Sequence, residues 1–490
     1  MGLQLRNSLT GEIEAFEPAD DEISLYYCGL TVSDRAHLGH ARSWVHVDVL
    51  RRWLEASGYD VRHVENFTDV NEKIVARIGE RPEWIDERSV AEHFIERTLA
   101  DMRALNLRRA HAYPRVTEHI EEIIQLTERL IEAGYAYEAN GSVYFDVPAF
   151  EGYGQLVEPD LEAETSDHPD KRHPADFALW KAGGVDPEDI EEHIKGTDLD
   201  LDAACAEAMT WDSPWGEGRP GWHIECSAMS MTHLDETFDI HVAGRDIAFP
   251  HNENEIAQSE AATGQTYARY WMHVDLLEID EEKMSSSLEN FLTVEGALNE
   301  HGPNVVRTYL LSASHATRQA FTESSLEEAS QRFERLQRSY DAMVSAVDSP
   351  QASVKSNDES LRAAVDDAVT TATEALDDNL DTRGALTALE GLATAVNQHL
   401  DEGRPYDYEG LLEAISTFDR FGTDVLGLRF AGDGQAPALG SLLDDLLAFR
   451  ESLREAGEYE YSDAIRDLFT EHDIEIEDTD EGPRARLPDR

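Results

Sequence analysis

The apolar residues of the first seventy positions switch between continuous runs and a helical spacing. Residues 23–32 (ISLYYCGLTV) form a largely apolar run, which is typical of a strand buried on both faces. Residues 43–59 repeat apolar side chains at helical intervals, and residues 59–70 return to a strand pattern. A strand, a helix and a strand with short connections predict the opening of a parallel α/β sheet. Residues 238–249 (FDIHVAGRDIAF) predict a further buried strand.

The second half of the chain has the pattern of amphipathic helices. Residues 326–347 and 360–380 carry apolar residues at intervals of three and four, which predicts a helical bundle. Residues 429–440, rich in glycine and alanine, predict a linker before a small module at 441–490. A chain of 490 residues is long enough for about three or four domains.

Two histidines and a glycine lie in the turn between the first strand and its helix. The segment HLGH contains His37, Gly39 and His40. In parallel α/β sheets, strand C-termini and helix N-termini meet at such turns, where backbone N–H groups and the helix dipole favour phosphate. Two surface histidines in a loop are the alternative interpretation.

A second histidine segment, FPHNENEIAQSEA, follows the strand at 238–249. Pro250 is predicted to open a helix, because its fixed φ suits the first turn. His251 and Glu255 then lie four residues apart on one helix face, where they could bind a metal ion together. A solvated face of an acidic helix explains the same pair.

Charge changes this picture strongly. The chain has 101 Asp and Glu against 41 Lys and Arg, a net charge of −60 spread over every segment, and only six lysines. Such a surface repels nucleic acid and membranes in dilute buffer. Concentrated salt removes that repulsion, since the Debye length falls to about 3 Å at 1 M, so the composition predicts adaptation to high salt. One rare lysine, Lys283, stands in the Ser-rich stretch EEKMSSSLEN, which favours a phosphate contact over a solubilising role.

The cysteines and the N-terminal sequence indicate in which cellular compartment the protein is expected. The three cysteines, Cys28, Cys205 and Cys226, are far apart and odd in number, which argues against a disulfide framework and for a reducing compartment. No apolar run long enough for a membrane span and no secretory signal is found, so we expect a cytoplasmic protein.

Several motifs together resemble one enzyme family. HLGH resembles the HIGH motif and KMSSS (283–287) the KMSKS motif of class I aminoacyl-tRNA synthetases. Cys28, the segment PGWHIECSAM and the segment FPHNENEIAQSEA together resemble the cysteinyl-tRNA synthetases. The resemblance implies a class I Rossmann-like catalytic domain with an insertion, followed by an α-helical bundle and a small mixed α/β C-terminal module.

The resemblance also implies a division into domains and a set of partners. We expect a catalytic first half (1–115), a connective insertion for the tRNA acceptor end (116–220), a catalytic second half (221–290), a stem-contact segment (291–325), a helical bundle (326–428) and an anticodon-binding module (441–490). The implied partners are L-cysteine, ATP with Mg²⁺, and tRNA-Cys, bound by a monomer.

Site residues are carried over from the same motifs. One Zn²⁺ would be held by Cys28, Cys226, His251 and Glu255. ATP would be bound by His37, Gly39, His40, Lys283 and Ser286, and of these His37, His40 and Lys283 would be catalytic. Cysteine would be bound by Cys28, Gly29, Thr68 and Trp222. Ordinary strand packing is the alternative for Thr68 and Trp222. Ser286 replaces the second lysine of KMSKS, which leaves open what else neutralises the phosphates.

The metal accounts for substrate choice, because shape alone distinguishes small side chains by only about 1–3 kcal/mol. Zinc prefers a thiolate to a hydroxyl, so it separates cysteine from serine. The implied function is cysteine–tRNA ligation. Two alternatives are a cysteine-adenylate-forming ligase of the mycothiol type and a non-catalytic zinc-containing RNA-binding protein.

Overall fold

The computed structural model describes residues 2–157, 169–194, 200–279, 282–283, 292–403 and 405–430, with separate short stretches between 446 and 486. The chain divides into two compact units, Met1–Leu428 and Arg429–Arg490, which are described separately. Within the described residues, no helix combines the length and the apolar character needed to cross a membrane.

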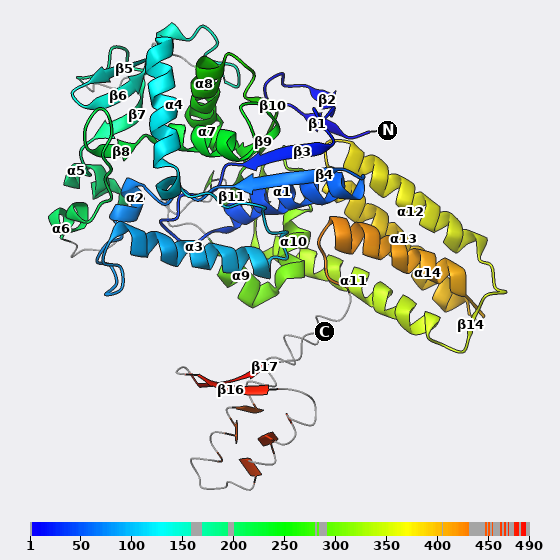
Figure 1. Cartoon of the computed structure of the whole chain (residues 1–490). Coiled ribbons are helices and arrows are strands. Elements are labelled where there is room, and N and C mark those ends of the chain that lie inside the picture. Colours follow the sequence, from blue (N-terminus) through cyan, green and yellow to red (C-terminus); the bar gives the residue numbers. More distant parts are fainter. Residues whose placement is uncertain are drawn as a thin grey trace. The chain divides into compact units, whose positions relative to one another are not determined.

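A four-stranded parallel sheet forms the centre of the first unit (Figure 1). Its order is β10-β9-β3-β4, with β3 at Glu22–Tyr27, β4 at Asp60–Glu65, β9 at Phe238–Gly244 and β10 at Ala268–Val274. Helix α1 (Leu38–Ala56) connects β3 to β4. The buried apolar runs predicted as strands are therefore neighbours in one sheet, and the predicted parallel α/β class is confirmed.

A second, antiparallel sheet lies between β4 and β9 in the sequence. Its order is β5-β6-β7-β8, at Ala136–Ala139, Ser142–Phe145, Phe177–Ala182 and Gly218–Pro220. The described residues between β4 and β8 also include five α-helices: α2 (Glu72–Val75), α3 (Glu87–Ala104), α4 (Ile120–Ala133), α5 (Pro187–Ile190) and α6 (Leu201–Ala206). The predicted insertion at 116–220 covers this sheet, and its boundaries stay a prediction.

This sheet is joined to the central one through a shared apolar core. Phe145 and Trp180 from the antiparallel sheet pack with Ile224 and Met229 of α7 (Trp222–His233) and Ala257 of α8 (Glu253–Thr263). Both α7 and α8 flank β9, so the insertion is fixed against the helices beside the central sheet.

Helices dominate the rest of the first unit, as the apolar spacing predicts. They are α9 (Val294–His301), α10 (Pro303–Leu310), α11 (Glu323–Val347), α12 (Glu359–Asp377), α13 (Thr382–Glu402) and α14 (Tyr408–Thr417). Short strands accompany them: β1 (Gln4–Arg6) with β2 (Ile13–Ala15), β11 (Leu277–Ile279) with β12 (Glu282–Lys283) and β13 (Gln319–Phe321), and β14 (Ala352–Ser353) with β15 (Tyr406–Asp407).

In the second unit, β16 (Glu475–Thr479) and β17 (Gly482–Arg486) form an antiparallel pair. Leu447 and Phe469 are buried there.

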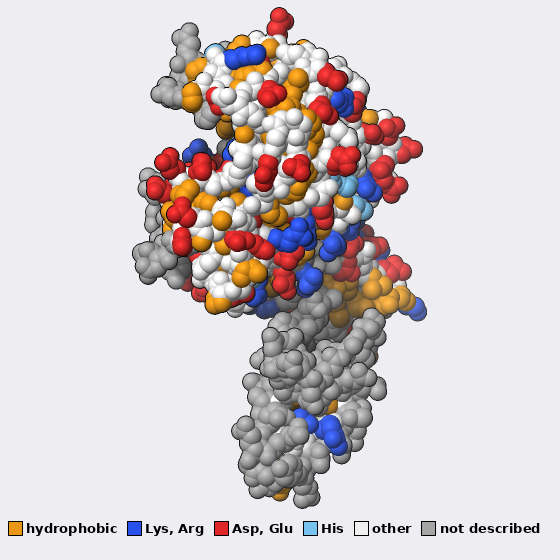
Figure 2. Space-filling model, turned by 60° about the vertical axis from the view of Figure 1, so that its left-hand side comes forward, with side chains coloured by type: hydrophobic (Ala, Val, Ile, Leu, Met, Phe, Trp, Pro, Cys, Tyr) orange, Lys and Arg blue, Asp and Glu red, His pale blue; other side chains and the backbone are white. Residues whose placement is uncertain are grey.

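Acidic side chains are scattered over the face of the molecule drawn in Figure 2, with smaller groups of lysine and arginine among them.

The predicted helix start at Pro250 is confirmed: Phe249 is the one residue of Ala248–Asn252 with non-helical φ/ψ, and a π-helical turn from Pro250 continues into α8. The α-helix begins at Glu253, and His251 lies in the preceding turn, Ala248–Asn252. Phe249 is extended, with φ −133° and ψ 135°, because a residue before proline disfavours the helical region. His251 contacts Glu255, since the turn leads directly into α8.

A buried ion pair ties the central sheet's first helix to the helices that follow. The guanidinium of Arg307 (α10) donates to Asp48 (α1) at 2.8 Å and to the carbonyls of Leu105 at 3.0 Å and Leu426 at 2.7 Å. Burial alone would raise the pKa of Asp48, but the charges of Arg307 and Arg52 outweigh it and lower the pKa. One cation therefore joins three distant segments.

We expect Arg307→Met to lower the free energy of unfolding by about 3–5 kcal/mol, because Asp48 and the carbonyls of Leu105 and Leu426 lose a buried charged donor. Denaturant titration in concentrated KCl measures this. Arg81→Met is the control, since Arg81 pairs with Glu83 at 3.9 Å on the surface and should change stability little. Equal stability of the two variants would contradict the role of Arg307.

Candidate active site

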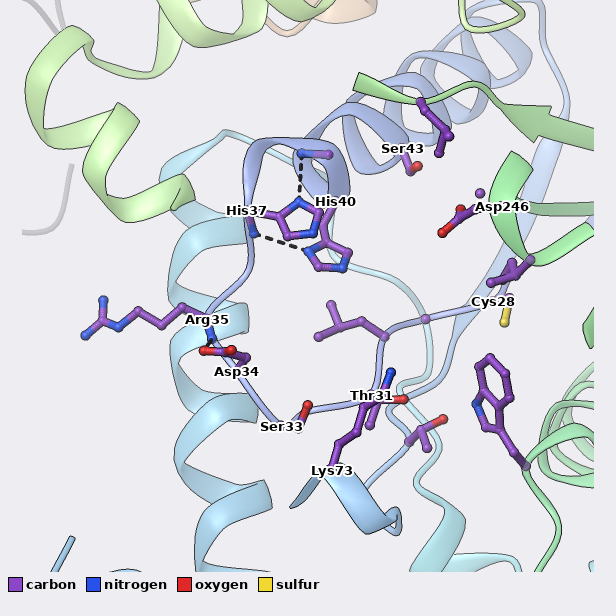
Figure 3. A pocket seen from close by; sticks show the side chains of 18 of the residues that line it. Cys28, Thr31, Ser33, Asp34, Arg35, His37, His40, Ser43, Lys73 and Asp246 are labelled. Atoms are coloured by element: carbon purple, nitrogen blue, oxygen red, sulfur yellow. Dashed lines mark hydrogen bonds between the residues drawn. The ribbon is translucent and has the colours of Figure 1, made fainter. Parts of the chain in front are cut away.

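The HLGH segment forms the N-terminus of α1 through a reciprocal pair of histidine bonds (Figure 3). The Nδ1 atom of His37 accepts from the Gly39 N–H at 3.0 Å, and the His37 N–H donates to Nδ1 of His40 at 3.2 Å. The two rings stack with their centroids 3.9 Å apart. A side chain at Gly39 would place Cβ only 2.7 Å from the ring of His37, so a larger residue would displace that ring from its position in the cap.

The chain that follows the KMSSS motif lies beside HLGH. The Leu38 N–H donates to the Leu292 carbonyl at 3.0 Å, and the Val294 N–H donates to the Ala36 carbonyl at 2.9 Å. Lys283, the first residue of that motif, pairs through its backbone with Glu278 in β11. The side chain of Lys283 and the whole of Ser286 lie outside the described residues.

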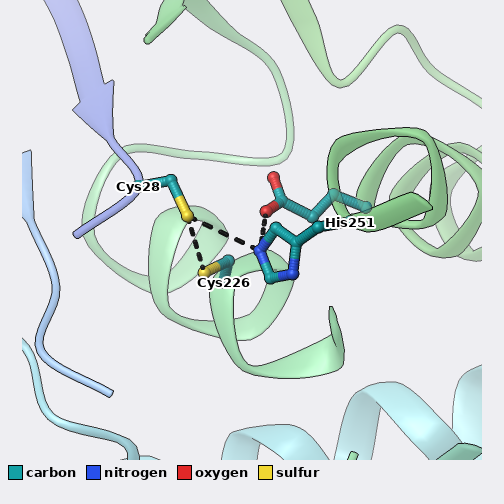
Figure 4. Close-up of side chains that lie close together, drawn as sticks. Cys28, Cys226 and His251 are labelled. Atoms are coloured by element: carbon teal, nitrogen blue, oxygen red, sulfur yellow. Dashed lines mark hydrogen bonds and ion pairs between the residues drawn. The ribbon is translucent and has the colours of Figure 1, made fainter. Parts of the chain in front are cut away.

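Four buried side chains from distant positions converge beside the C-terminal end of β3 (Figure 4). They are Cys28 after β3, Cys226 in α7, His251 before α8, and Glu255 in α8. Their ligand atoms all lie within 4.8 Å of one another. The Sγ atom of Cys28 is 3.5 Å from Sγ of Cys226 and 3.5 Å from Nε2 of His251. The cluster proposed from the motifs is thus brought together by the fold.

The carboxylate of Glu255 is fully buried between two histidines. Its Oε1 is 2.7 Å from Nε2 of His251, and its Oε2 is 2.6 Å from Nε2 of His241 in β9. Burial would raise the pKa of Glu255, but the charges of His241 and His251 outweigh it and lower the pKa to about 2. Burial would lower the pKa of His251, but the charge of Glu255 outweighs it and raises this pKa to about 10.

The other ring nitrogen of His251 also has a partner. Its Nδ1 lies 3.0 Å from Nδ1 of His223, whose pKa is lowered well below its ordinary value by burial and by the charge of His251. A neutral His223 accepts a hydrogen bond from the His251 Nδ1–H, which leaves Nε2 of His251 directed at the cluster. Metal-binding histidines are oriented in the same way.

The two thiols are protonated when the site carries no cation. The pKa of Cys226 is raised well above its ordinary value, first by the hydrogen bond with Cys28 and then by burial. For Cys28 the same hydrogen bond lowers the pKa, but burial and Glu255 outweigh it and raise it. A metal ion bound here would therefore displace protons from sulfur.

A cavity of about 430 Å³ opens between HLGH and this cluster (Figure 3). Seven of the residues proposed from the motifs line it: Cys28, Gly29, His37, Gly39, His40, Thr68 and Trp222. Cys226, His251 and Glu255 are fully buried and are not among its lining residues. The proposed nucleotide and amino-acid residues therefore face one space.

Gly29 and Trp222 shape the end of the cavity that lies beside the cysteine cluster. The Gly29 N–H donates to the side chain of Asn66 at 2.8 Å, and a Cβ on Gly29 would lie 1.7 Å from the Asn66 carbonyl oxygen. The ring of Trp222, 37% exposed at the start of α7, lies 4.5 Å from that of His251. Trp222 thus covers the cluster on the cavity side.

The cavity also holds residues that the motifs did not indicate. They include Ser43, Lys73, Arg77, Glu192, His193 and Asp246. Asp246 comes directly after the buried strand β9. Its position at the end of a predicted strand could have marked it as a candidate site residue. His193 lies in an acidic segment with no local pattern, and only the tertiary fold places it here.

One carboxylate fastens the insertion to α8. Glu253, fully buried between His251 and Glu255 in the sequence, accepts from four successive backbone N–H groups. The donors are Gly154 at 2.6 Å, Gln155 at 2.8 Å, Leu156 at 2.7 Å and Val157 at 3.3 Å. A loop of the insertion is therefore held on the helix that carries Glu255.

The sheet, the HLGH turn and the cavity define a class I aminoacyl-tRNA synthetase. Residues 15–331 match the family described as tRNA synthetases class I (C) catalytic domain, and residues 372–431 match the DALR domain. Among solved structures, Mycobacterium tuberculosis methionyl-tRNA synthetase with methionyl-adenylate has a TM-score of 0.57 at 14% identity, covering 82% of this chain and 89% of that chain. An Agrobacterium radiobacter LeuRS–tRNA–LeuAMS complex has a TM-score of 0.58 at 11% identity, covering 84% and 85%. These two likenesses concern the fold.

The chain belongs to the cysteine–tRNA ligase family. A cysteine–tRNA ligase of Haloarcula marismortui is 56% identical, covering 99% of this chain and 100% of the relative. The Halobacterium salinarum protein is 53% identical over 98% and 99%, and that of Thermococcus gammatolerans 39% over 98% and 98%. The first two come from halophilic archaea, which supports the salt adaptation predicted from the net charge of −60.

We expect Glu253→Gln to release residues 154–157 from α8. Amide hydrogen exchange of these four residues should accelerate about tenfold or more, because charge-assisted bonds contribute about 1.5–3 kcal/mol. The control is Glu260→Gln in the same helix, since Glu260 bonds the side chain of Gln155 and not these amides. Unchanged exchange in Glu253→Gln would contradict the proposed fastening.

Proposed function

We propose that the chain activates L-cysteine with ATP and transfers the cysteinyl group to the 3′ end of tRNA-Cys. The observation that carries this proposal is the buried Cys28–Cys226–His251–Glu255 cluster beside a cavity lined by HLGH. In the transfer step the ribose oxygen forms the ester bond to the carbonyl carbon. AMP leaves with the electron pair of the broken bond, and the ribose proton passes to its phosphate.

The cluster is proposed to hold one Zn²⁺. Two sulfurs, an imidazole and a carboxylate are a typical zinc donor set, and zinc–sulfur bonds of about 2.3 Å in a tetrahedron place two sulfurs about 3.8 Å apart. The separation of 3.5 Å between the two Sγ atoms is close to this value. Zinc bound there would supply a position that prefers the sulfur of cysteine to the oxygen of serine. The hydrogen bonds of His241 and His223 orient Glu255 and His251 for it.

The amino acid is proposed to lie between the cluster and Trp222. Gly29 lets the chain pass close to Asn66, and Thr68 lines the same wall. Packing against Trp222 excludes water from the side chain of the substrate, which strengthens electrostatic contacts inside the site.

ATP, with Mg²⁺, is proposed to lie along HLGH. His37 and His40 fix each other through Nδ1 contacts within the turn, and both line the cavity in which the phosphates would lie. Lys283 would stabilise the charge that grows on the departing pyrophosphate. Ser286 has no charge, so the role of the second lysine of KMSKS is assigned to no residue here.

Two other functions remain to be tested. A small-molecule ligase built on the catalytic half would not need residues 441–490, yet relatives named cysteine–tRNA ligase cover 98–99% of this chain. A non-catalytic RNA-binding protein would not need the reciprocal histidine cap of HLGH. Incubation with labelled cysteine and ATP, with and without tRNA-Cys, separates tRNA charging, pyrophosphate exchange alone, and neither.

We also propose a cytoplasmic monomer, which light scattering and fractionation would test.

We expect Cys28→Ser and His251→Ala to lose stoichiometric zinc and cysteine-dependent pyrophosphate exchange, because each removes a ligand from the cluster. Binding of ATP should be largely kept, since its proposed contacts lie at HLGH. Cys205→Ser is the matched control, as this cysteine is outside the cluster. Full zinc content and activity in Cys28→Ser would overturn the metal assignment.

We expect Lys283→Ala to lower kcat for cysteine activation more than it raises KM for ATP, since the charge that Lys283 meets develops as pyrophosphate leaves. Steady-state pyrophosphate exchange gives both constants. Lys355→Ala, in the helical region, serves as control for the loss of one lysine. Identical constants for the wild type and Lys283→Ala would remove the catalytic role.

A further inference from the structure

One edge of the cavity is used by neither the cysteine cluster nor HLGH. It is formed by Lys73 of α2 and by residues 192–194, which belong to the insertion and follow α5. Helices α2 and α5 pack against each other, so the two parts of this edge form one wall. Figure 3 shows the side chain of Lys73 extending from α2 into the cavity beside Thr31.

Lys73 differs from the cations around it. Arg77 pairs with Glu80 at 3.0 Å and donates to the Ser33 carbonyl at 3.2 Å. Lys181 is bound to Glu72, and Arg35 to Glu295. Within the described part of the chain, the ammonium group of Lys73 makes no ion pair, although the net charge is −60 and acidic residues are abundant. Lys73 is therefore available to an anion that enters the cavity.

His193 provides a neutral polar group on the same wall. Burial lowers the pKa of His193, and the positive charge of Lys73 lowers it further. The neighbouring carboxylate of Glu192 is 3.5 Å from its Nε2. A neutral imidazole can both donate and accept a hydrogen bond, which suits a ribose or a base. The wall thus combines a cation that makes no ion pair with any described residue and one hydrogen-bonding ring.

The chemistry of transfer requires a third ligand in this cavity. Cysteine is directed to the buried cluster and the triphosphate to HLGH, so the terminal ribose must reach the carbonyl carbon from the remaining edge. The RNA end carries one phosphate per nucleotide into a strongly acidic protein, and a cation at the edge offsets that repulsion.

We propose that Lys73 and His193 form a subsite for the terminal nucleotides of the tRNA acceptor end. Lys73 contacts a backbone phosphate, and His193 hydrogen-bonds the terminal nucleoside. This inference rests on the proposed function, because only the transfer step brings a polynucleotide into the cavity.

The test compares two half-reactions of Lys73→Gln in concentrated KCl. Cysteine-dependent pyrophosphate exchange reports activation, and single-turnover transfer from preformed cysteinyl-adenylate to a tRNA-Cys transcript reports the subsite. We expect the single-turnover transfer rate at subsaturating tRNA to fall about tenfold more than the exchange rate, because a contact with a charged group is lost. Lys73→Arg should restore most of the transfer, and His193→Phe should show a smaller loss of the same kind. Lys355→Gln controls for the loss of one positive charge.

Each result decides between the alternatives. Equal losses in exchange and transfer would mean that Lys73 contacts ATP or cysteine, and no loss in either would mean that it contacts nothing; both overturn the subsite. A wild-type protein that charges no tRNA at all would instead overturn the proposed function. Circular dichroism of each variant verifies that the fold is kept.

Discussion

The carboxylate of Glu255, buried between His241 and His251, is the interaction on which the rest of the site depends. A buried charge of this kind is tolerated only when its partners surround it, and the two histidines do so at 2.6 and 2.7 Å. They come from β9 and from the turn before α8, while the two cysteines come from the end of β3 and from α7. The central sheet must therefore place β3 beside β9, with α7 and α8 against them, for the four side chains to meet.

The same constraint explains why an acidic helix lies in the interior. Residues Glu253–Ser259 of α8 are all buried, although the sequence ENEIAQS has the composition of a solvated face. Glu255 faces the cluster, and Glu253 faces the backbone of 154–157. Because both carboxylates are neutralised by donors on opposite sides, α8 links the insertion to the cysteine end of the cavity.

Much of this arrangement could be predicted from local pattern. Continuous apolar runs predicted β3 and β9, helical spacing predicted α1 and α11, and the motifs named the four members of the cluster. The helix start at Pro250 was also predicted, because Phe249 is held extended before the proline, but the π-helical form of the first turn was not. Lys73, His193 and Glu253 were missed because their roles arise from contacts with chain segments far away in the sequence, which spacing does not encode. The side chain of Lys283 and all of Ser286 lie outside the described residues, so their roles stay predictions.

Buried arginines explain how so acidic a chain keeps its parts together in salt. Concentrated salt screens exposed ion pairs strongly and buried pairs much less. Arg219 makes two bonds of 2.7 Å to Glu87, and both side chains are buried. Arg42 and Arg307, with no exposed surface, bind carbonyl groups that end neighbouring segments. These three arginines are thus placed where salt screens their contacts only weakly. Within the described residues Lys73 makes no ion pair, which is why we propose it as a phosphate contact in a protein with a net charge of −60.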